Sequence, residues 1–428
     1  MQIYIKTYGC TLNQADSEII KSILLDRNAS ICDNEKDADV VVINTCTVKE
    51  PTEIKILYKI RQLNKENKKM VITGCMAGAN SDMLKRYAPN ASIVSSSNIA
   101  GIGEVIDLAY YGKNEDMLDY KRFDKLILPL NIDDVIAKIP ISEGCLGNCS
   151  FCETKFARGP LNSFSEDLII KAIENSIKAS SKEIQLTAQD TGAYGVDRNT
   201  DIIKLLNRIE GIEGDFMLRL GMFNPEHFKR LDIYKLIDIF QSDKIYKFIH
   251  LPIQSGSNEV ISHMGRNCSV EEFEDYVRIL REGVKGISIE TDIIVGYPTE
   301  KEEDFEATLN LIKKTKPDVT NISKFGKRPH TRASALKQLE NSVIKNRSIR
   351  LFNEVRKVQY SINSKLIGKT IDGLITSSTP LSVNGRTDSY KQIVLKNMAS
   401  NKHKSEIGKR VKVKVNAVSA NVLYCEIV

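Results

Sequence analysis

The sequence lacks several features that would point to other classes of protein. No apolar stretch approaches the length needed to span a bilayer, which predicts no membrane partner. The opening residues, MQIYIKTYGC, favour a β-strand rather than a secretory signal peptide. Histidine is scarce, and neither His250 nor His263 has a spacing typical of metal ligands. Gly283 and Gly286 form no nucleotide-binding fingerprint.

Cysteine, by contrast, is plentiful. Nine cysteines in a chain without a secretory signal favour reduced thiols and metal ligation over disulfides. We therefore expect a cytoplasmic protein. Its 428 residues exceed one ordinary domain, so two or three domains are expected. With 42% hydrophobic and 27% charged residues, the composition is that of an ordinary globular protein.

The positive charge is concentrated near the C-terminus. The net charge is +6, and residues 365–428 hold eleven Lys and Arg against four Asp and Glu. This segment therefore contains the whole excess. A basic surplus on a small module is typical of a protein that binds a polyanion. A merely well-solvated surface is the alternative.

Three cysteines lie close together in the run EGCLGNCSFCETKFARGP. Cys145, Cys149 and Cys152 have the spacing C-x3-C-x2-C, which supplies three thiolates from one loop. Cysteine thiolates are the usual ligands of iron–sulfur clusters. On a four-iron cubane, three cysteines leave one iron open to bind another molecule. A zinc knot is the alternative, but structural zinc takes four protein ligands and no second pair lies nearby.

Three further cysteines follow predicted strands of an N-terminal α/β unit. Its short β-branched runs alternate with helix-like windows, which predicts a parallel sheet covered on both faces. The predicted strands are 2–9, 39–45, 69–74 and 91–95, and the predicted helices are 15–25 and 50–64. Cys10, Cys46 and Cys75 follow the first three strands, and Asn13 and Asn44 flank them. Because parallel strands share their carboxyl edge, a second three-cysteine cluster is expected there. Three unrelated buried cysteines are the alternative.

The rest of the chain predicts two more units. Six strands alternate with amphipathic stretches between about residues 134 and 339, as in a TIM-like or partial barrel with chemistry at its strand carboxyl ends. The predicted strands are 137–144, 183–190, 215–221, 246–252, 286–298 and 318–325. A basic helix at 345–366 then leads to short strands that predict a small antiparallel β-barrel. On one of these strands Lys412 and Lys414 share a face, where they contact phosphates or only protect an exposed strand.

These motifs resemble the radical S-adenosylmethionine (SAM) methylthiotransferase family over nearly the whole chain. The three-cysteine loop is similar to the radical SAM signature, including Phe151 before the last cysteine. CTLN, NTC and GCMA after the N-terminal strands are similar to the family's patterns, as are HLPIQSGS, ETDIIVGYPTE and the helix entering LIGK. GCLGNCSFCETKFARG and LTAQDTGAYG are most similar to the archaeal and eukaryotic threonylcarbamoyladenosine tRNA methylthiotransferases. The run GKRPHTRAS departs from the family, because His330 takes the place of a glycine.

The resemblance implies an α/β multidomain fold. Its expected parts are a methylthiotransferase domain at 1–120, a radical SAM barrel at 131–362 and a TRAM RNA-binding domain at 363–428. Two 4Fe–4S clusters and SAM are the implied cofactors. The implied partners are the anticodon loop of tRNA and an external electron donor, while the sulfur source is not indicated.

The resemblance also implies roles for the cysteines. The cluster on Cys145, Cys149 and Cys152 would cleave SAM to a 5′-deoxyadenosyl radical, which removes hydrogen from C2 of a modified adenosine. The cluster on the other three cysteines would supply sulfur that a first SAM molecule methylates. The expected product is 2-methylthio-N6-threonylcarbamoyladenosine at position 37 of tRNA.

Polar residues near the ends of the barrel strands are predicted SAM contacts, although each is alternatively a helix cap or a structural pair. The predicted cofactor contacts are Phe151, Gln189, Asp190, Arg219, Gln254 and Asp292. Two other functions remain open. In the first, the same chemistry acts on another target, either isopentenyladenosine in tRNA or an aspartate of a ribosomal protein. In the other interpretation, the chain is a non-enzymatic RNA-binding protein with structural or redox-sensing clusters.

Overall fold

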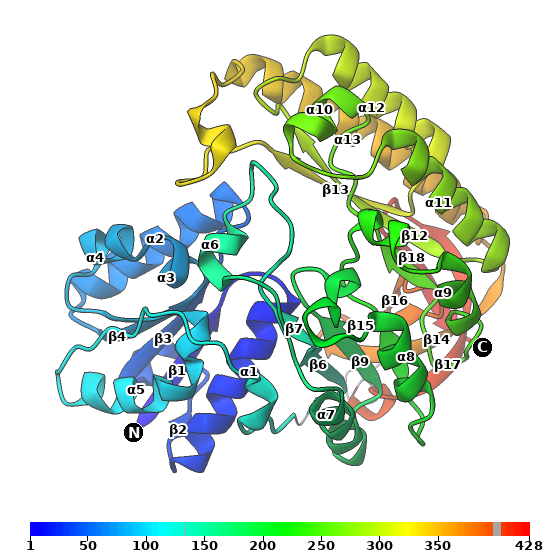
Figure 1. Cartoon of the computed structure of the whole chain (residues 1–428). Coiled ribbons are helices and arrows are strands. Elements are labelled where there is room, and N and C mark those ends of the chain that lie inside the picture. Colours follow the sequence, from blue (N-terminus) through cyan, green and yellow to red (C-terminus); the bar gives the residue numbers. More distant parts are fainter. Residues whose placement is uncertain (133, 397–403) are drawn as a thin grey trace.

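The computed structural model describes residues 1–132, 134–396 and 404–428, and it contains three sheet-based units (Figure 1). An N-terminal α/β unit, blue to cyan, lies beside a parallel barrel, green to yellow. A closed β-barrel, orange to red, lies behind the parallel barrel in this view. Each unit has its own hydrophobic core. Within the described residues, no helix is both long and apolar enough to cross a membrane.

The N-terminal sheet is parallel, as predicted, and has five strands in the order β2-β1-β3-β4-β5. The strands are β1 (Gln2–Thr7), β2 (Ser30–Ile31), β3 (Val40–Thr45), β4 (Lys69–Gly74) and β5 (Ser92–Val94). The two-residue strand β2 was not predicted, because so short a segment shows no alternation of side chains. This strand order is that of flavodoxin-like sheets, in which ligands bind beyond the strand carboxyl ends.

Helices cover both faces of this sheet, and this explains why its strands are continuously apolar. All six residues of β3 are buried. Val41 and Ile43 point to one core, while Val40 and Val42 point to the other. The helices are α1 (Thr11–Asp26), α2 (Glu50–Lys65), α3 (Cys75–Ala79), α4 (Ser81–Tyr87) and α5 (Ile102–Tyr110). Helix α1 begins four residues before the predicted start, because Leu12 is the one apolar residue of its first turn and gives no periodic signal.

The second unit contains the six predicted parallel strands. They form two three-stranded ladders, β10-β9-β6 and β11-β12-β13, joined by the parallel bridges Leu218↔Ile245 and Met222↔His250. Between β6 and β13 the described residues form no ladder, so the barrel is partial. The strands are β6 (Ile136–Pro140), β9 (Glu183–Thr187), β10 (Met217–Arg219), β11 (Phe248–His250), β12 (Ser288–Val295) and β13 (Val319–Lys324).

Amphipathic helices pack around this barrel. In α8 (Ile202–Glu210) the apolar residues Ile202, Leu205, Leu206 and Ile209 are buried. The other helices are α7 (Glu166–Lys178), α9 (Ile233–Ile239), α10 (Asn258–His263), α11 (Val270–Gly283) and α12 (Glu302–Thr315). The first predicted barrel strand splits after Pro140, and β7 (Ser142–Glu143) pairs antiparallel with β8 (Asn162–Ser163). This small hairpin brackets the three-cysteine loop and the short helix α6 (Thr154–Arg158).

The third unit is a closed barrel with the strand order β14-β15-β16-β18-β17. Four of its strand pairs are antiparallel, as predicted, but β16 and β18 pair in parallel. A five-stranded barrel of this kind has the architecture of oligonucleotide-binding folds. Its strands are β14 (Thr370–Thr379), β15 (Ser382–Thr387), β16 (Gln392–Lys396), β17 (Arg410–Val418) and β18 (Val422–Ile427). The preceding helix α13 (Asn341–Ser364) crosses the predicted domain limit at residue 363.

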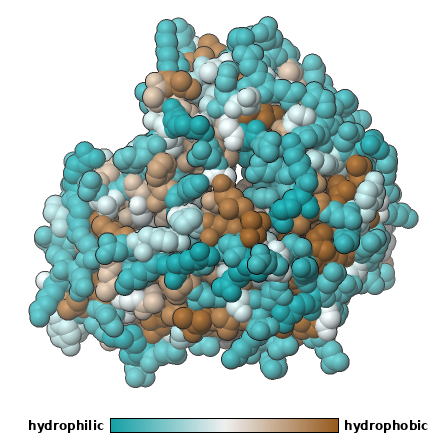
Figure 2. All heavy atoms as spheres, viewed as in Figure 1, coloured by the Kyte–Doolittle hydropathy of each residue, from teal (hydrophilic) through white to brown (hydrophobic). Residues whose placement is uncertain are grey.

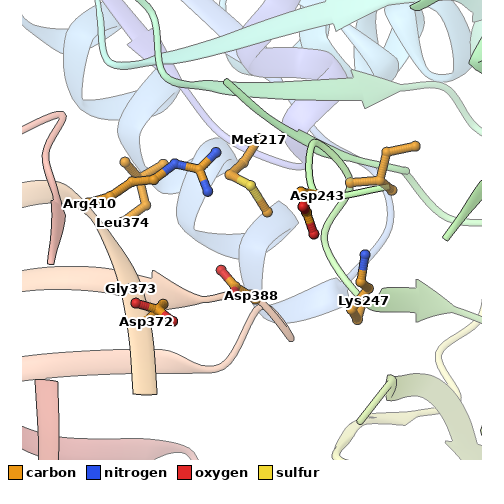
Figure 3. A pocket seen from close by; sticks show the side chains of 9 residues that line it. Met217, Asp243, Lys247, Asp372, Gly373, Leu374, Asp388 and Arg410 are labelled. Atoms are coloured by element: carbon orange, nitrogen blue, oxygen red, sulfur yellow. The ribbon is translucent and has the colours of Figure 1, made fainter. Parts of the chain in front are cut away.

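The closed barrel packs against the amino ends of the parallel strands. Tyr390 lies against Tyr246 and Phe248, with ring centroids 4.9 and 4.7 Å away. Its hydroxyl donates to Glu183 at the start of β9 over 3.3 Å. Beside this contact is a cavity of about 280 Å³ (Figure 3). The closed barrel therefore lies at the opposite end of the parallel barrel from the cysteine loop.

The surface is mainly hydrophilic on the face shown in Figure 2, with hydrophobic residues gathered near its centre.

The three predicted domain limits stay predictions, but every strand ladder falls inside one of the predicted segments.

Candidate metal centres

The three N-terminal cysteines meet at one edge of the sheet, as the sequence analysis predicted. Cys46 and Cys75 directly follow β3 and β4, and Cys10 follows β1 by three residues. Because β1, β3 and β4 are neighbours, their carboxyl ends lie side by side. Gly9 and Gly74 have φ angles of +119° and +88°, which side chains other than glycine rarely adopt. A Cβ on Gly9 would also come within 2.9 Å of the Cys46 Cβ.

Asn13 links two of these cysteines, Cys10 and Cys75, to each other. Its Oδ1 accepts from the Cys10 thiol over 3.4 Å and from the Cys75 thiol over 3.8 Å. Its Nδ2 donates to Asn44 Oδ1 and to the Thr45 carbonyl. Both asparagines are fully buried. The flanking asparagines therefore hold the cysteine turns together rather than acting as exposed polar groups.

The second triad lies in the loop between β7 and α6. The backbone amide of Gly147 donates to the Cys145 sulfur over 3.2 Å, and Arg266 Nη1 donates to the Cys149 sulfur over 3.8 Å. Ser150 anchors the loop to the barrel, since its hydroxyl lies 2.8 Å from the Tyr297 hydroxyl. All three cysteines are partly exposed. The loop is thus fixed in place while its thiols stay accessible.

Burial keeps several of these thiols protonated in the absence of a metal. It raises the pKa of Cys46 to about 12, and the neighbouring Cys75 acts in the same direction. Burial likewise raises the pKa of Cys145 to about 12 and lifts the pKa of Cys10 and of Cys149. Metal binding to these four thiols would therefore displace protons.

The sulfur atoms of neither triad are close enough together to hold a single zinc ion. Tetrahedral zinc, with Zn–S bonds of about 2.3 Å, holds its sulfur atoms about 3.8 Å apart. We compared the ligand atoms of His, Cys, Asp and Glu in the described chain. Three of them lie within 4.8 Å of one another only at Asp190, Glu226 and His227, so neither cysteine triad is this compact. Sets of three cysteine thiols are instead the donor type usual for a polynuclear iron–sulfur cluster.

The two cysteine triads face each other across the domain boundary. Glu153, the residue after Cys152, accepts hydrogen bonds from the Thr47 hydroxyl and from Asn80 Nδ2, the latter over 2.6 Å. A Cβ on Gly78 would collide with the backbone of Ala157, so α3 and α6 touch. Arg328, beyond β13, forms an ion pair with Glu53 of the N-terminal unit. Direct contacts therefore hold the two cysteine edges together.

A buried charge network also crosses this boundary. It joins α1 of the N-terminal unit to the cysteine loop of the barrel, and all its side chains are nearly inaccessible. Arg158 belongs to the loop segment, yet its Nε donates to the Cys75 sulfur over 3.4 Å. The members of the network are Asp16, Lys125, Glu143 and Arg158.

The predicted SAM contacts differ in how free their side chains are. The Asp190 carboxylate accepts from the Gly192 and Asn224 amides and lies 2.7 Å from His227 Nε2, so it holds a turn together. Gln189 keeps a buried Oε1 without a partner among the described protein atoms, which leaves it able to bind a ligand. Phe151 packs beside Tyr297 and Phe325 in a small core. As cofactor contacts, all six residues stay predictions.

Inside the barrel, Asp292 forms a polar pair that sequence reasoning missed. His250 Nε2 lies 3.1 Å from the Asp292 carboxylate, and Asn321 donates to the same carboxylate over 2.8 Å. Burial lowers the pKa of His250, but the charge of Asp292 overcomes this, so the pKa is raised overall. Gln254 has a φ of +78°, and its backbone N–H donates to the backbone carbonyl of Asp292. Arg219 lies over the ring of Phe248, 5.3 Å from its centroid.

Lys412 and Lys414 lie on β17 and point outward, as predicted. Lys412 forms an exposed ion pair with Asp372 over 3.1 Å. Such exposed pairs contribute little to stability, so both ammonium groups can contact an outside polyanion. Their predicted role in RNA binding stays a prediction.

Several residues of the site escaped the sequence analysis. Arg158, Arg266 and Glu153 contact a cysteine or its neighbouring turn, but no periodic pattern marks them. Lys125 and Asp16 meet although they lie 109 positions apart in the chain. Nothing local to any of these residues predicts its partner. Only the position of Arg158 and Glu153 beside the cysteine run hinted at a role.

Comparison with known families agrees with the two halves of this site. Residues 2–96 match the model described as "Uncharacterized protein family UPF0004". Residues 139–312 match the radical SAM superfamily. The parallel partial barrel with its C-x3-C-x2-C loop therefore makes this chain a radical SAM protein.

Similar proteins specify the family more closely. A "Probable threonylcarbamoyladenosine tRNA methylthiotransferase" from Pyrococcus horikoshii is 41% identical, and the match covers 92% of this chain and 93% of that protein. The Archaeoglobus fulgidus protein of the same name is 38% identical over 99% of this chain and 98% of its own length. The "Threonylcarbamoyladenosine tRNA methylthiotransferase" of Homo sapiens is 35% identical over 81% of this chain and 61% of its own. The chain belongs to the family of threonylcarbamoyladenosine tRNA methylthiotransferases.

Solved structures share the fold at low sequence identity. The radical SAM methyltransferase TsrM from Kitasatospora setae has a TM-score of 0.58 at 14% identity, covering 78% of this chain and 74% of that chain. The cobalamin-dependent radical enzyme OxsB has a TM-score of 0.54 at 10% identity, covering 84% of this chain and 56% of that chain. At this identity the likeness concerns the fold alone. It confirms the predicted pairing of an α/β unit with a radical SAM barrel.

Proposed function

We propose that this enzyme methylthiolates C2 of N6-threonylcarbamoyladenosine at position 37 of tRNA. The product is 2-methylthio-N6-threonylcarbamoyladenosine. The observation that carries this proposal is the pair of three-cysteine sets held against each other, with Glu153 joining the turn after Cys46 to the loop ending at Cys152. One set suits the cleavage of SAM, and the other suits a sulfur donor placed beside it.

The chemistry explains why two centres are needed. The C2–H bond of an adenine ring has no useful acidity, so side-chain acid–base groups cannot break it and a cofactor must. A cluster held by Cys145, Cys149 and Cys152 would supply the electron for the cleavage of SAM, and one held by Cys10, Cys46 and Cys75 would supply the sulfur. The protein contributes alignment, which is worth most when both partners are held rigidly.

The geometry supports one assignment of the residues that would hold the two clusters. Cys145, Cys149 and Cys152 would hold the cluster that binds SAM, with Arg266 donating to one of its sulfur ligands. Cys10, Cys46 and Cys75 would hold the auxiliary cluster, with Asn13 orienting two of the thiols. Three ligands for each four-iron cluster leave one iron available to an outside molecule.

The closed C-terminal barrel suits RNA binding. Its five-stranded architecture is common among oligonucleotide-binding modules, and its segment holds the positive excess of the chain. We assign the target base of the anticodon loop to the two cysteine edges, since this base must leave its stack to react. An external electron donor is required, and a tRNA substrate favours a cytoplasmic enzyme.

Nucleoside mass spectrometry of tRNA tests this proposal directly. Cells that lack the protein should retain threonylcarbamoyladenosine and lose its 2-methylthio derivative, and the gene should restore the derivative. Loss of 2-methylthio-isopentenyladenosine instead would assign the other tRNA target. Unchanged tRNA nucleosides with a changed ribosomal protein would overturn the proposal.

A further inference from the structure

Arg158 connects the two halves of the site in an unusual way. It lies at the end of α6, six residues after Cys152, and so belongs to the radical SAM loop segment. Its contact, however, is with the other triad, where Nε donates to the Cys75 sulfur over 3.4 Å. The residue is 1% exposed. A guanidinium from one cluster segment therefore touches a ligand of the other cluster.

The rest of the guanidinium is held by buried carboxylates. Nη1 lies 2.7 Å from Asp16 Oδ2 and 3.0 Å from Glu143 Oε1. Lys125 Nζ contacts the same two carboxylates, at 2.8 and 2.9 Å. The hydrogen bond to Glu143 and the ion pair with Asp16 hold Nη1, and this favours the orientation in which Nε–H points to the sulfur. The donor is preorganised.

The network contains two cations and two carboxylates, so it is neutral without the thiols. Buried ion pairs are costly to desolvate and stabilise a fold poorly compared with apolar packing. Lys125 alone already contacts both carboxylates. In addition, Arg158 Nη2 is buried without a partner among the described protein atoms. Unpaired N–H donors on a guanidinium that contacts the Cys75 sulfur fit a polar group from outside the protein, such as a cluster sulfide.

We propose that Arg158 is a positioning residue of the auxiliary centre, which fixes the Cys75 sulfur and makes that cluster easier to reduce. This inference rests on the proposed function of the N-terminal cysteines. A hydrogen bond and a positive charge at a sulfur ligand stabilise the more negative, reduced state of a cluster, which raises its reduction potential. Since Arg158 comes from the loop segment, this effect also requires that the two domains be docked.

The radical SAM loop offers a matched control. Arg266 donates to the Cys149 sulfur over 3.8 Å. It therefore contacts a ligand of the loop cluster in the same way that Arg158 contacts a ligand of the auxiliary cluster. Each cluster can be observed alone in the full-length chain. C145A/C149A/C152A leaves the auxiliary cluster, and C10A/C46A/C75A leaves the loop cluster. R158Q and R266Q are then introduced into both backgrounds.

The test is an anaerobic redox titration followed by electron paramagnetic resonance, with iron counted in every sample. R158Q should shift the auxiliary midpoint potential to a more negative value and leave the loop cluster unchanged. R266Q should do the reverse. R158K should recover part of the auxiliary shift because it restores the charge. An auxiliary midpoint that R158Q does not move, at full iron content, would overturn the proposal.

A folding defect is separated from this effect by a second pair of variants. R158Q leaves two carboxylates facing one cation, whereas D16N/R158Q restores the charge balance. D16N alone should shift the potential the opposite way, and the double variant should keep a smaller negative shift, because the hydrogen bond to the Cys75 sulfur is still lost. Loss of auxiliary iron from R158Q and D16N/R158Q, with an unchanged melting temperature of the apoprotein, supports the role. A collapse of the apoprotein fold in every Arg158 variant, R158K included, would reduce Arg158 to a structural residue. None of these outcomes depends on tRNA modification, so failure of the proposed function would be seen separately.

Discussion

The hydroxyl of Thr47 donates a hydrogen bond to the carboxylate of Glu153, two buried residues from different domains. Thr47 follows Cys46 and Glu153 follows Cys152, so this single contact joins the turns that carry the two cysteine triads. Asn80 donates to the second oxygen of the same carboxylate. This interaction is one of the contacts that hold the two cysteine edges together, and it can be tested.

Removing the Thr47 hydroxyl should loosen this joint. T47V is nearly isosteric but takes a donor from a buried carboxylate, which costs about 1–3 kcal/mol. We expect a lower melting temperature and a larger loss of methylthiolation than of SAM cleavage. T7V is the matched control, because Thr7 bonds Ser17 within the N-terminal unit over 2.7 Å. Equal losses of both activities in T47V would argue against a role in aligning the centres.

Cys149→Ala should abolish SAM cleavage and leave tRNA binding intact. The change removes one of three ligands of the loop cluster, while the closed barrel lies at the far end of the parallel barrel. Production of 5′-deoxyadenosine, measured with a chemical reductant, should fall to background. Cleavage at the wild-type rate would remove this loop from the active centre.

Cys46→Ala should separate the two half-reactions. The loop cluster keeps its ligands, so reductive SAM cleavage should continue, but methylthiolation should stop because the auxiliary centre loses a ligand. Cys32→Ala is a suitable control, since the Cys32 thiol bonds a nearby carbonyl over 3.5 Å and lies outside both triads. Full yield of the methylthio product in C46A would refute the auxiliary role.

Reversing Lys412 and Lys414 to Glu should weaken tRNA binding at low salt. Each lost phosphate contact should reduce the slope of log affinity against log salt by about 0.7–0.9. The control is K171E/K178E, which reverses the same number of exposed charges on α7. If both double variants bind tRNA equally well at low salt, β17 is only a solvated strand.

The pair formed by His250 and Asp292 should make stability depend on pH. The pKa of His250 is raised in the folded protein above its ordinary value near 6.5. The charged imidazolium therefore stabilises the fold fully below pH 6.5, and this contribution is lost as pH rises through the folded pKa. In unfolding experiments on the apoprotein, the stability advantage of the wild type over H250Q should shrink from pH 6 to pH 8. A difference that stays constant with pH would show that His250 does not titrate.

The fold and both cysteine sets were largely predictable because their signals are local. Continuous apolar strands such as β3 identify a sheet covered on both faces, and a parallel sheet necessarily brings Cys10, Cys46 and Cys75 to one edge. The loop cysteines are recognisable by their spacing. The family name required the resemblance of the motifs, since spacing alone does not identify the target base.

What sequence reasoning missed depends on distant partners. The Asp16–Lys125 pair and the Arg158 contact with Cys75 join segments 83 to 109 positions apart. The parallel pairing of β16 with β18 is set by closure of the barrel, not by either strand. The contacts of the Asp190 carboxylate with the Gly192 and Asn224 amides and with His227 were likewise not visible in the sequence. Such partners become visible only once the chain is folded.

The central claim is that the chain carries two clusters, each with an iron that no cysteine holds. Iron analysis of the anaerobically reconstituted protein, combined with electron paramagnetic resonance before and after addition of SAM, tests it most directly. We predict about eight iron atoms per chain and a changed signal when SAM binds the loop cluster. About four iron atoms per chain, or a signal indifferent to SAM, would contradict the account.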